Sequence, residues 1–332
     1  MQPSPSNAAE PISPESEVKT PVSSMEEKKF GSKKMKWVIG VIVALIIILP
    51  CVTFLLGVYK FEWQGPFVDR VMRAVPLPAA TVNGEWINYA EWSRGVATVN
   101  HFYAQKEELG LSSSLPDLTA EQIESNELDR LIEQQLLEDL AAQYQISVSP
   151  DEIEVEYTAS ILPQATNEAE IIETVEKLYG WTLDEFKQEI VREVVLRAKL
   201  QTTMNADETF NAGAKQIIDQ AKADLTVGQA FSDVAFKYSE DGSAQDGGDL
   251  DWIEKGQTVP EFETVAFATA VGATSEIFTS PYGYHILTVL ETDEERVHVA
   301  HILAKFTTID EEVVSLKDSA KIKRFVAPET AE

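Results

Sequence analysis

Hydrophobic and polar positions divide this chain into stretches of different periodicity. Residues 37–59 form an apolar run without a single charge, whereas residues 1–36 are rich in Pro, Ser and charged side chains and show no apolar period. From about residue 79 to 201, apolar positions recur every three or four residues, as on one face of a helix. After Ala212, helical patterns alternate with a glycine-rich loop and a short apolar strand, so the sequence predicts an α+β protein.

The apolar run over residues 37–59 predicts a transmembrane helix, because at about 1.5 Å per residue it can cross the ~30 Å hydrocarbon layer. Lysines crowd the residues before it and only Lys60 follows closely, a bias that keeps the N-terminus in the cytoplasm. A cleaved signal peptide is the alternative, but no A-x-A-like site follows the run. We therefore expect a disordered cytoplasmic tail over residues 1–36, a linker over residues 60–78 and an extracytoplasmic location for the bulk of the chain at the cell membrane.

Residues 79–205 predict a helical domain that opens with a hairpin. Asn83-Gly84 between short apolar runs is a strong signal for a tight turn. Three capping-box spacings mark helix starts, at Thr119, Ser149 and Thr182. In one helix the apolar residues fall three and four positions apart, which predicts a packed face, with an open cradle for unfolded chains as the alternative. They are Leu128, Leu131, Ile132, Leu136 and Leu140.

Composition removes several classes of function. Among 332 residues, 55 Asp and Glu outnumber 27 Lys and Arg, and the resulting charge of −28 argues against nucleic acid as a partner. Four His and one Cys are too few for a multi-ligand zinc module or a disulfide framework, and no G-x-S-x-G elbow, H-E-x-x-H helix or P-loop occurs. We expect neither a metal nor another cofactor.

Residues 206–306 carry the candidate chemistry. Thr226 and Gln229 have capping-box spacing, and several glycines permit a loop with unusual backbone angles. The apolar strand over residues 286–290 has His285 at its entrance. Taken from the residues alone, such a histidine is more often structural than catalytic, and both roles stay open at this point.

Three motifs in this stretch, KYSEDGSAQDGGDLDW, VPEFETVAF and FTSPYGYHIL, closely resemble the parvulin family of peptidyl-prolyl cis/trans isomerases. The resemblance implies a small antiparallel sheet wrapped by helices, which isomerises X-Pro bonds without a metal. It implies catalytic roles for Asp241, Thr279, His285 and His301, and a proline-binding role for Leu250, Thr258, Phe262 and Phe267. Two positions depart from the family: Thr258 stands where parvulins usually carry Met or a similar apolar side chain, and Asp251 replaces a Gly of the GGDLGW pattern.

The opening strand of a parvulin, which reads V-x-x-x-H-I-L, is missing from the start of this stretch. The segment VHVAHIL at residues 297–303 fits it, with His301 in the matching position. Three interpretations stay open: a strand permuted to the end of the same domain, a remnant of a second domain, or a strand donated to another chain. In the permuted form, a loop over residues 292–294 would place His285 opposite His301 and turn His298 to the other face.

The helical stretch, with its Val-Asn-Gly hairpin and the segment ISVSPDEIEVEY, resembles the N-terminal chaperone region of the SurA and PrsA type. The two resemblances together imply a membrane-anchored foldase that acts on unfolded, proline-containing polypeptides exported from the cytoplasm. A catalytically inactive, membrane-tethered holdase is the main alternative, and a scaffold for an envelope complex is a weaker one. Residues 307–332 predict one helix followed by a frayed end.

Overall fold

The chain is described by a computed structural model that covers residues 32–61, 63, 65–106 and 116–326. These residues belong to two compact units, Met1–Trp63 and Gln64–Glu332. The larger unit holds a helical module and a sheet module, each with a core of its own. The α+β class predicted from the sequence is confirmed, with small antiparallel sheets in a helix-rich chain.

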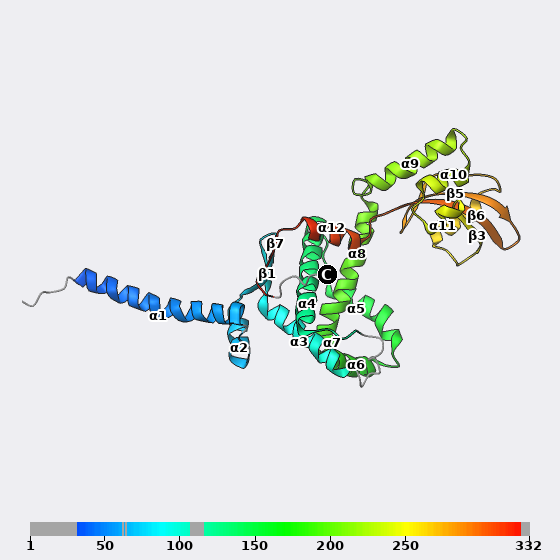
Figure 1. Cartoon of the computed structure of the whole chain (residues 1–332). Helices are drawn as coiled ribbons and strands as arrows, with labels where there is room; N and C mark the ends of the chain where they lie inside the picture. The colour runs from blue at the N-terminus through cyan, green and yellow to red at the C-terminus, as the bar shows by residue number, and fades with distance from the viewer. Residues whose placement is uncertain (1–31, 62, 64, 107–115, 327–332) are drawn as a thin grey trace, which may run out of the picture. The chain divides into compact units, whose positions relative to one another are not determined.

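The first unit is built on helix α1, Ser32–Phe61, which contains Pro50 (Figure 1). The helix begins inside the stretch predicted as a disordered tail, whose residues 1–31 lie outside the described residues. It contains the predicted membrane span, although the side chains of residues 32–44 are also outside the described ones. Across the part of the chain that the structure describes, no helix combines the length and the apolar character needed to cross a membrane.

The helical module contains the helices that follow. They are α2 (Pro66–Ala74), α3 (Tyr89–Gln105), α4 (Ala120–Gln143), α5 (Pro150–Glu156), α6 (Glu168–Tyr179), α7 (Leu183–Phe186) and α8 (Arg192–Ala206). Short turns of other helix types lie between them, namely η1 (Tyr157–Ile161), η2 (Leu162–Gln164) and η3 (Lys187–Val191). Helix α2 lies within the residues that the sequence pattern indicated as a linker.

The predicted helix starts are confirmed in atomic detail. Thr119, Ser149 and Thr182 each accept a hydrogen bond from the backbone N–H three residues later, and the side chain of that later residue accepts one from the backbone N–H of the cap residue. The apolar stripe of α4 is buried, so its packed-face interpretation is also confirmed. It packs partly under the first sheet and partly against α8.

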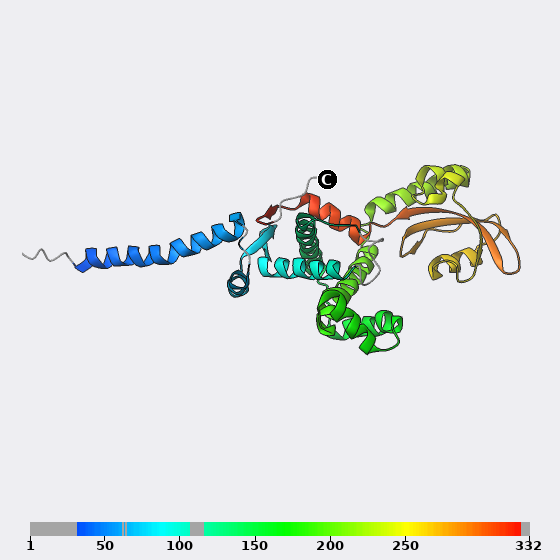
Figure 2. The ribbon, with the colours of Figure 1, turned by 60° about the horizontal axis from the view of Figure 1, so that its bottom comes forward.

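The first sheet has the strand order β2-β1-β7, with β1 at Pro78–Val82, β2 at Glu85–Asn88 and β7 at Ile322–Arg324. The hairpin turn falls on Asn83 and Gly84, whose φ angles of 53° and 101° are those of a tight turn that matches the twist of the strands. Strand β7 pairs antiparallel with β1, and Figure 2 shows the two strands side by side. The frayed end predicted after the last helix is therefore wrong as far as Arg324.

The C-terminal segment returns to the helical module through α12, Ile309–Ser319. Ile309 and Val313 are buried against Leu196 and Leu200 of α8. The helix prediction for this segment is confirmed, and Thr308 provides a further capping box at its start. The helical module is thus made from two separate parts of the chain, with the sheet module inserted between them.

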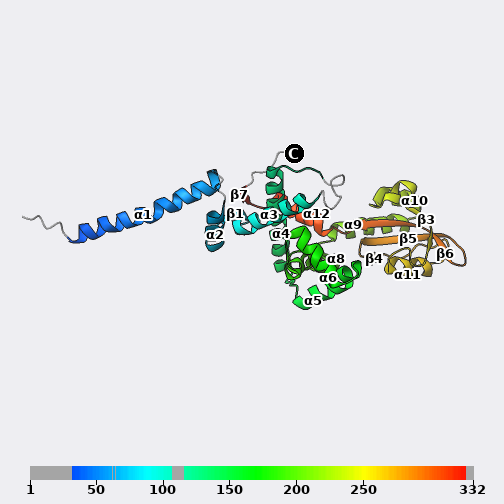
Figure 3. The same ribbon diagram turned by 90° about the horizontal axis from the view of Figure 1, so that it is seen from below.

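The sheet module comprises the elements between these parts. They are α9 (Ala212–Thr226), α10 (Phe231–Tyr238), η4 (Gly242–Asp246), β3 (Asp249–Glu254), α11 (Pro260–Ala268), β4 (Phe278–Ser280), β5 (Gly283–Thr292) and β6 (Arg296–Lys305). All pairs in the sheet β3-β6-β5-β4 are antiparallel. Ile286 and Ile302 pack against α9 and α10 on one face, whereas Leu287 and Val299 pack against α11 on the other (Figure 3).

The predicted capping box at Thr226 is wrong. Thr226 is the last residue of α9, and α10 begins at Phe231 after Ala230, which offers no side-chain cap. The spacing to Gln229 therefore falls in the connection between the two helices. A capping box needs an extended N-cap residue followed by helix, and here the helix precedes the Thr.

Strand β6 pairs with β5 and β3 of the same chain, as the permuted-strand interpretation predicted. The predicted register is wrong by two residues, because the turn falls after Thr292 and His285 pairs with Leu303 rather than with His301. A β-bulge between Val289 and Glu291 adds a further irregularity. Since side chains alternate with a period of two, this slip leaves both histidines on the same face.

Candidate active site

The centre of the candidate site is a pair of buried histidines on adjacent strands. His285 of β5 and His301 of β6 are 4% and 5% exposed, and their rings lie 5.7 Å apart at an angle of 28°. Leu287 is the direct partner of His301 in the ladder, so the two histidines are diagonal neighbours. Diagonal residues on one face remain within reach when the side chains are long or aromatic.

Burial governs the charge of this pair. Desolvation, and next the proximity of His301, lower the pKa of His285 to about 4, although the Asp241 carboxylate opposes the shift. Burial also lowers the pKa of His301, against the attraction of Asp241. Because the charged form of a buried imidazole is disfavoured, both rings are neutral at pH 7.

Asp241 lies beside His301 because it caps η4. Its Oδ2 accepts a hydrogen bond of 2.9 Å from the backbone N–H of Ser243 and lies 3.2 Å from Nε2 of His301. Partial burial would raise the pKa of Asp241, but the N–H and hydroxyl of Ser243 and the ring of His301 outweigh it and lower the pKa to about 2. The carboxylate is therefore ionised throughout the physiological range.

Glycine permits the close approach that joins this loop to the sheet. Gly248 has a φ of 83°, and its carbonyl accepts a 2.8 Å hydrogen bond from the backbone N–H of His301. A Cβ at this position would lie 2.2 Å from the carbonyl oxygen of His301. Only glycine fits both the backbone angle and the space, so the glycine-rich motif fixes the position of the Asp241 loop against β6.

Ser280, rather than Thr279, supplies the hydroxyl of the site. Ser280 Oγ lies 2.7 Å from Nε2 of His285 and accepts a hydrogen bond from the backbone N–H of Tyr282. Thr279 is exposed, because alternation along β4 turns it away from the face that carries Phe278 and Ser280. The structure therefore does not bring Thr279 into contact with the histidine pair.

An apolar wall faces the histidines. The ring of Phe262 on α11 is 4% exposed and lies 5.6 Å from each imidazole, edge-on to both. Phe278 stacks on His285 at 5.2 Å. Leu250 and Phe267 pack partly buried against the same cluster as Phe262, so the predicted substrate-binding side chains gather on one face of the sheet.

Unpartnered polar atoms concentrate at this face. Among the described residues, six buried side-chain nitrogen or oxygen atoms lack a hydrogen bond of good geometry, and five of them belong to Ser243, Thr258, His285 and His301. Two of the five, Ser243 Oγ and His301 Nε2, still interact with the Asp241 carboxylate. Thr258 lies two residues before α11, the helix that carries Phe262. Leaving a buried polar group unpaired costs about 1–3 kcal/mol, so the Nδ1 atoms of the two histidines lie in the site at a cost to stability.

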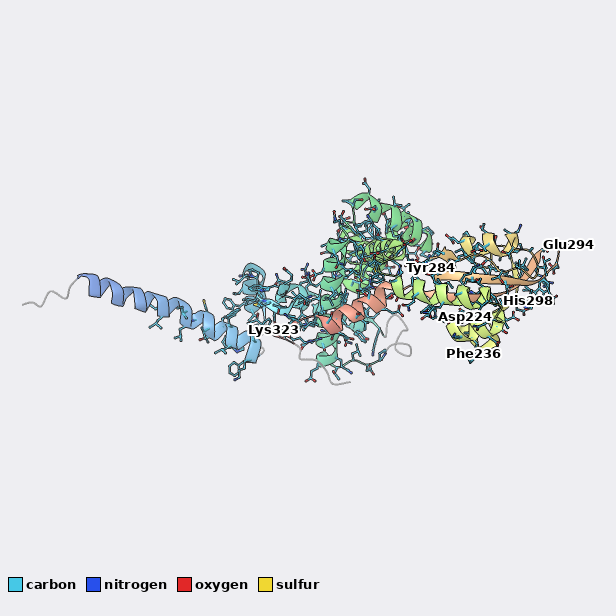
Figure 4. The ribbon with its side chains drawn as sticks, turned by 90° about the horizontal axis from the view of Figure 1, so that it is seen from above. Asp224, Phe236, Tyr284, Glu294, His298 and Lys323 are labelled. Atoms are coloured by element: carbon cyan, nitrogen blue, oxygen red, sulfur yellow. The ribbon has the colours of Figure 1, made fainter. Side chains whose placement is uncertain are left out.

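His298 belongs to a separate group at the other end of β6. Its Nε2 lies 2.7 Å from Asp249 Oδ1 and its ring packs on Trp252. Figure 4 shows His298 near Glu294 at the tip of the β5–β6 hairpin. The prediction that His298 faces away from His301 is confirmed by these contacts, and His298 takes no part in the candidate site.

Two family profiles match the chain. Residues 196–291 match the family described as PPIC-type PPIASE domain, and residues 28–201, more than half of the chain, match the SurA-like N-terminal domain. The first range contains Asp241, Phe262 and His285 but ends at residue 291, so strand β6 with His301 lies after the matched range.

Similar proteins include the foldase protein PrsA of Geobacillus kaustophilus, 33% identical over 216 residues that cover 62% of this chain and 70% of the relative. The chaperone SurA of Chromobacterium violaceum is 42% identical over 78 residues, which cover 24% of this chain and 18% of that protein. Among solved structures, a peptidylprolyl isomerase (PrsA) from Bacillus anthracis aligns with 57% of this chain and 87% of its own. Its sequence identity is 22% and its TM-score 0.21.

Proposed function

This chain belongs to the family of SurA-like and PrsA foldase chaperones and carries a parvulin-type peptidyl-prolyl isomerase domain, and from this we propose that it accelerates cis/trans isomerisation of X-Pro bonds in exported polypeptides. Its partners would be unfolded or extended segments that contain proline. The observation that carries the proposal is the histidine pair packed between the Asp241 carboxylate and the ring of Phe262.

The chemistry of the reaction suits this arrangement. Rotation about an X-Pro bond breaks amide resonance and meets a barrier of about 18–20 kcal/mol, so the uncatalysed reaction takes tens of seconds or more. An apolar wall that holds the proline ring, together with polar groups that bind the twisted amide better than the planar one, lowers this barrier. Phe262 supplies the wall, and the buried imidazoles of His285 and His301, each with an unpaired Nδ1, supply polar groups.

We further propose that residues 37–59 anchor the protein in the cell membrane, with the N-terminus in the cytoplasm and the two modules outside. The uncharged run and the lysines before it support this orientation. The absence of cysteine after Cys51 means that the modules depend on packing alone for their stability. Protease accessibility of the modules in intact cells or spheroplasts tests the orientation, and digestion only after lysis would contradict it.

The proposed activity is tested with the full chain and a short peptide that contains one X-Pro bond. We expect the wild type to accelerate cis-to-trans conversion, and Asp241→Asn to lower kcat/KM about tenfold or more, because the fixed charge beside His301 is lost. Asp246→Asn is the matched control, since Asp246 is an exposed carboxylate of the same short helix η4. Peptide kinetics at the solvent rate with wild-type protein would overturn the assignment of turnover to this chain.

A holdase that binds clients without turnover is the second candidate, and Thr258 favours it. A hydroxyl at this position, where the parvulins that the sequence resembles usually carry an apolar side chain, can bond to a polar group of the client and so favours client binding. Suppression of client aggregation, measured on the same preparation, separates the two functions. A pure holdase suppresses aggregation and leaves the peptide rate unchanged, whereas a foldase with turnover does both.

A further inference from the structure

A groove in the helical module has no role in the isomerase chemistry. It opens between α3, α4 and the segment from the end of α6 to η3, and consists of two adjoining cavities of about 310 and 320 Å³. The two cavities share six of their lining residues, which are Gly95, Thr98, Arg130, Tyr179, Trp181 and Glu189. Cavities of this size are at the lower end of those that take small molecules or peptide side chains.

One wall of the groove is a row of stacked aromatic rings. Phe102 lies parallel to Tyr179 at 6.2 Å and 11°, and Tyr179 stacks on Trp181 at 5.1 Å and 27°. Trp181 is held in place by a 3.1 Å hydrogen bond from its Nε1–H to Thr98 Oγ1. All three side chains are only half-buried, so part of the aromatic row lies at the surface of the groove, with Trp181 at one end of the stack.

The lining of the groove also carries an excess of negative charge. Five carboxylates line the two cavities against two guanidinium groups, those of Arg94 and Arg130. The carboxylates are those of Glu91, Glu127, Glu185, Glu189 and Glu193. Glu193 is paired with Arg197 at 2.8 Å, which leaves four carboxylates against the two guanidinium groups, so the groove keeps a net negative charge and favours a cation.

Arg130 offsets only part of this excess, because it hydrogen-bonds to one carboxylate. Its Nε and Nη2 donate to the two oxygens of Glu127, which is 4% exposed, at 3.0 and 2.7 Å. A Cβ on Gly95 would overlap the Glu127 carboxylate, so Gly95 gives the buried carboxylate of this ion pair its room. Within the described residues neither Glu91 nor Glu189 forms an ion pair, and burial and next the charge of Glu189 raise the pKa of Glu91 against the attraction of Arg94 and Arg130. A cation in the groove would relieve this repulsion.

We propose that this groove is a second client-binding site that takes an arginine side chain of an extended polypeptide. The guanidinium group would stack on Trp181 or Tyr179 while it donates hydrogen bonds to Glu91 and Glu189, and apolar neighbours in the client would cover Phe102. Arginine suits such a site better than lysine because its planar group stacks on aromatic faces and forms two parallel bonds to a carboxylate. The inference rests on the chaperone function proposed above and extends it to segments without proline.

Peptide binding to the full chain tests the proposal. The probe is a fluorescein-labelled peptide without proline, in which one arginine stands between leucines, and binding is followed by fluorescence anisotropy. Matched peptides replace the arginine with norleucine or glutamate. We expect the norleucine peptide to bind about fivefold more weakly and the glutamate peptide at least about tenfold more weakly. Equal binding of the three peptides, or no binding of the arginine peptide, would overturn the proposal.

Charge-removing variants locate the site. The double variant Glu91→Gln with Glu189→Gln should raise the Kd of the arginine peptide about fivefold and should reduce its preference over the norleucine peptide. Glu173→Gln is the matched control, because Glu173 is an exposed carboxylate of α6 outside the groove. An unchanged Kd in the double variant would contradict the assignment. Isomerisation of an X-Pro peptide should stay at the wild-type rate in every variant, so failure here is distinct from failure of the isomerase proposal.

Discussion

His285 and His301 stack face to face at 5.7 Å although they are two positions apart in the strand register. Both rings are buried, and each keeps at least one nitrogen without a hydrogen bond of good geometry. Of the two rings, that of His301 contacts the Asp241 carboxylate, whereas that of His285 is bonded to the Ser280 hydroxyl. The pair is therefore chemically asymmetric, and its neutral state is set by burial rather than by a partner for each nitrogen.

Stability should fall as the histidine pair is protonated. The folded pKa of His285, about 4, lies below its ordinary value of 6.5, so the unfolded chain binds more protons between these two pH values. The stability that the neutral His285 contributes is fully present above about pH 6.5. It is lost as the pH falls towards 4, and the total loss in unfolding free energy is about 3 kcal/mol. Urea unfolding of the sheet module at several pH values between 7.5 and 4.5 measures it.

His285→Gln provides the control for this titration, because glutamine keeps a polar side chain near Ser280 but cannot be protonated. The difference in unfolding free energy between wild type and variant should shrink as the pH falls through the window from 6.5 to 4. Asp241 should cause a separate loss of folding stability as the pH falls below 3.8, because its pKa in the folded protein is about 2. A difference that stays constant from pH 7.5 to 4.5 would contradict the burial argument.

Gly248→Ala should disrupt the site far more than Gly256→Ala. Both glycines have similar φ angles, 83° and 87°, but a Cβ at Gly248 meets the backbone of His301 whereas one at Gly256 meets open space. We expect about 1–2 kcal/mol of backbone strain at both positions and an additional loss of about 1–3 kcal/mol at Gly248. Thermal unfolding compares the two variants, and equal losses would show that the close approach is not rigid.

Much of the fold could be predicted because its motifs are local. The capping boxes at Thr119 and Ser149 and the Asn83-Gly84 turn depend on a few adjacent residues, and each forms as expected. Alternation also kept His285 and His301 on one face despite the wrong register, because a slip of two residues does not change the face. The same alternation would have selected Ser280 over Thr279, since Ser280 shares its face with Phe278.

Other features depend on contacts between distant segments and were missed. Strand β7 is three residues long, too short for a periodic signal, and exists because β1 offers it an edge. The groove beside Trp181 brings together residues from α3, α4 and η3 whose charges look like ordinary surface positions in the sequence. The turn falls after Thr292 and a β-bulge follows Val289, and the two together set the register of the hairpin, which the residues of the turn did not indicate.

The ion pairs that hold the C-terminal segment should be measurable in the helical module. Arg324 Nη2 and Lys317 Nζ both bind Oδ1 of Asp129, at 2.6 and 2.7 Å, and the Arg324 side chain is largely buried. Because removal of Arg324 leaves Asp129 half-paired, Arg324→Met should cost about 1–3 kcal/mol in urea unfolding. Lys323→Met, an exposed change on the same strand, should stay within about 0.5 kcal/mol.

A double-mutant cycle with Asp129→Asn separates this interaction from loss of packing. If the ion pair dominates, the cost of Arg324→Met should fall by at least about half in the Asp129→Asn background. Full additivity of the two changes would instead assign the cost to the aliphatic part of the arginine. The isomerase rate should be unaffected, because these residues belong to the helical module.

Phe262→Ala should cost both stability and activity. Its buried ring contacts Phe278, His285 and His301, so truncation leaves a cavity at the centre of the site and should cost about 3–5 kcal/mol. Phe236→Ala is the control in the same module, because Phe236 is 61% exposed and should change stability by no more than about 0.5 kcal/mol. A loss of activity without a loss of stability would show that Phe262 acts only on the substrate.

Thr258→Val should stabilise the folded sheet module and weaken catalysis. Oγ1 of Thr258 is buried without a hydrogen-bond partner, and valine removes that group while it keeps the shape of the side chain. We expect a gain of about 1 kcal/mol in the unfolding free energy. If the bound peptide supplies the missing partner of this hydroxyl, its removal should lower kcat/KM several-fold through a higher KM, measured on the same X-Pro peptide.

Thr264→Val, an exposed change on α11, is the matched control. A stabilised variant with unchanged kcat/KM would show that the hydroxyl does not contact the substrate, and an unchanged stability would mean that its missing partner costs nothing in the free protein.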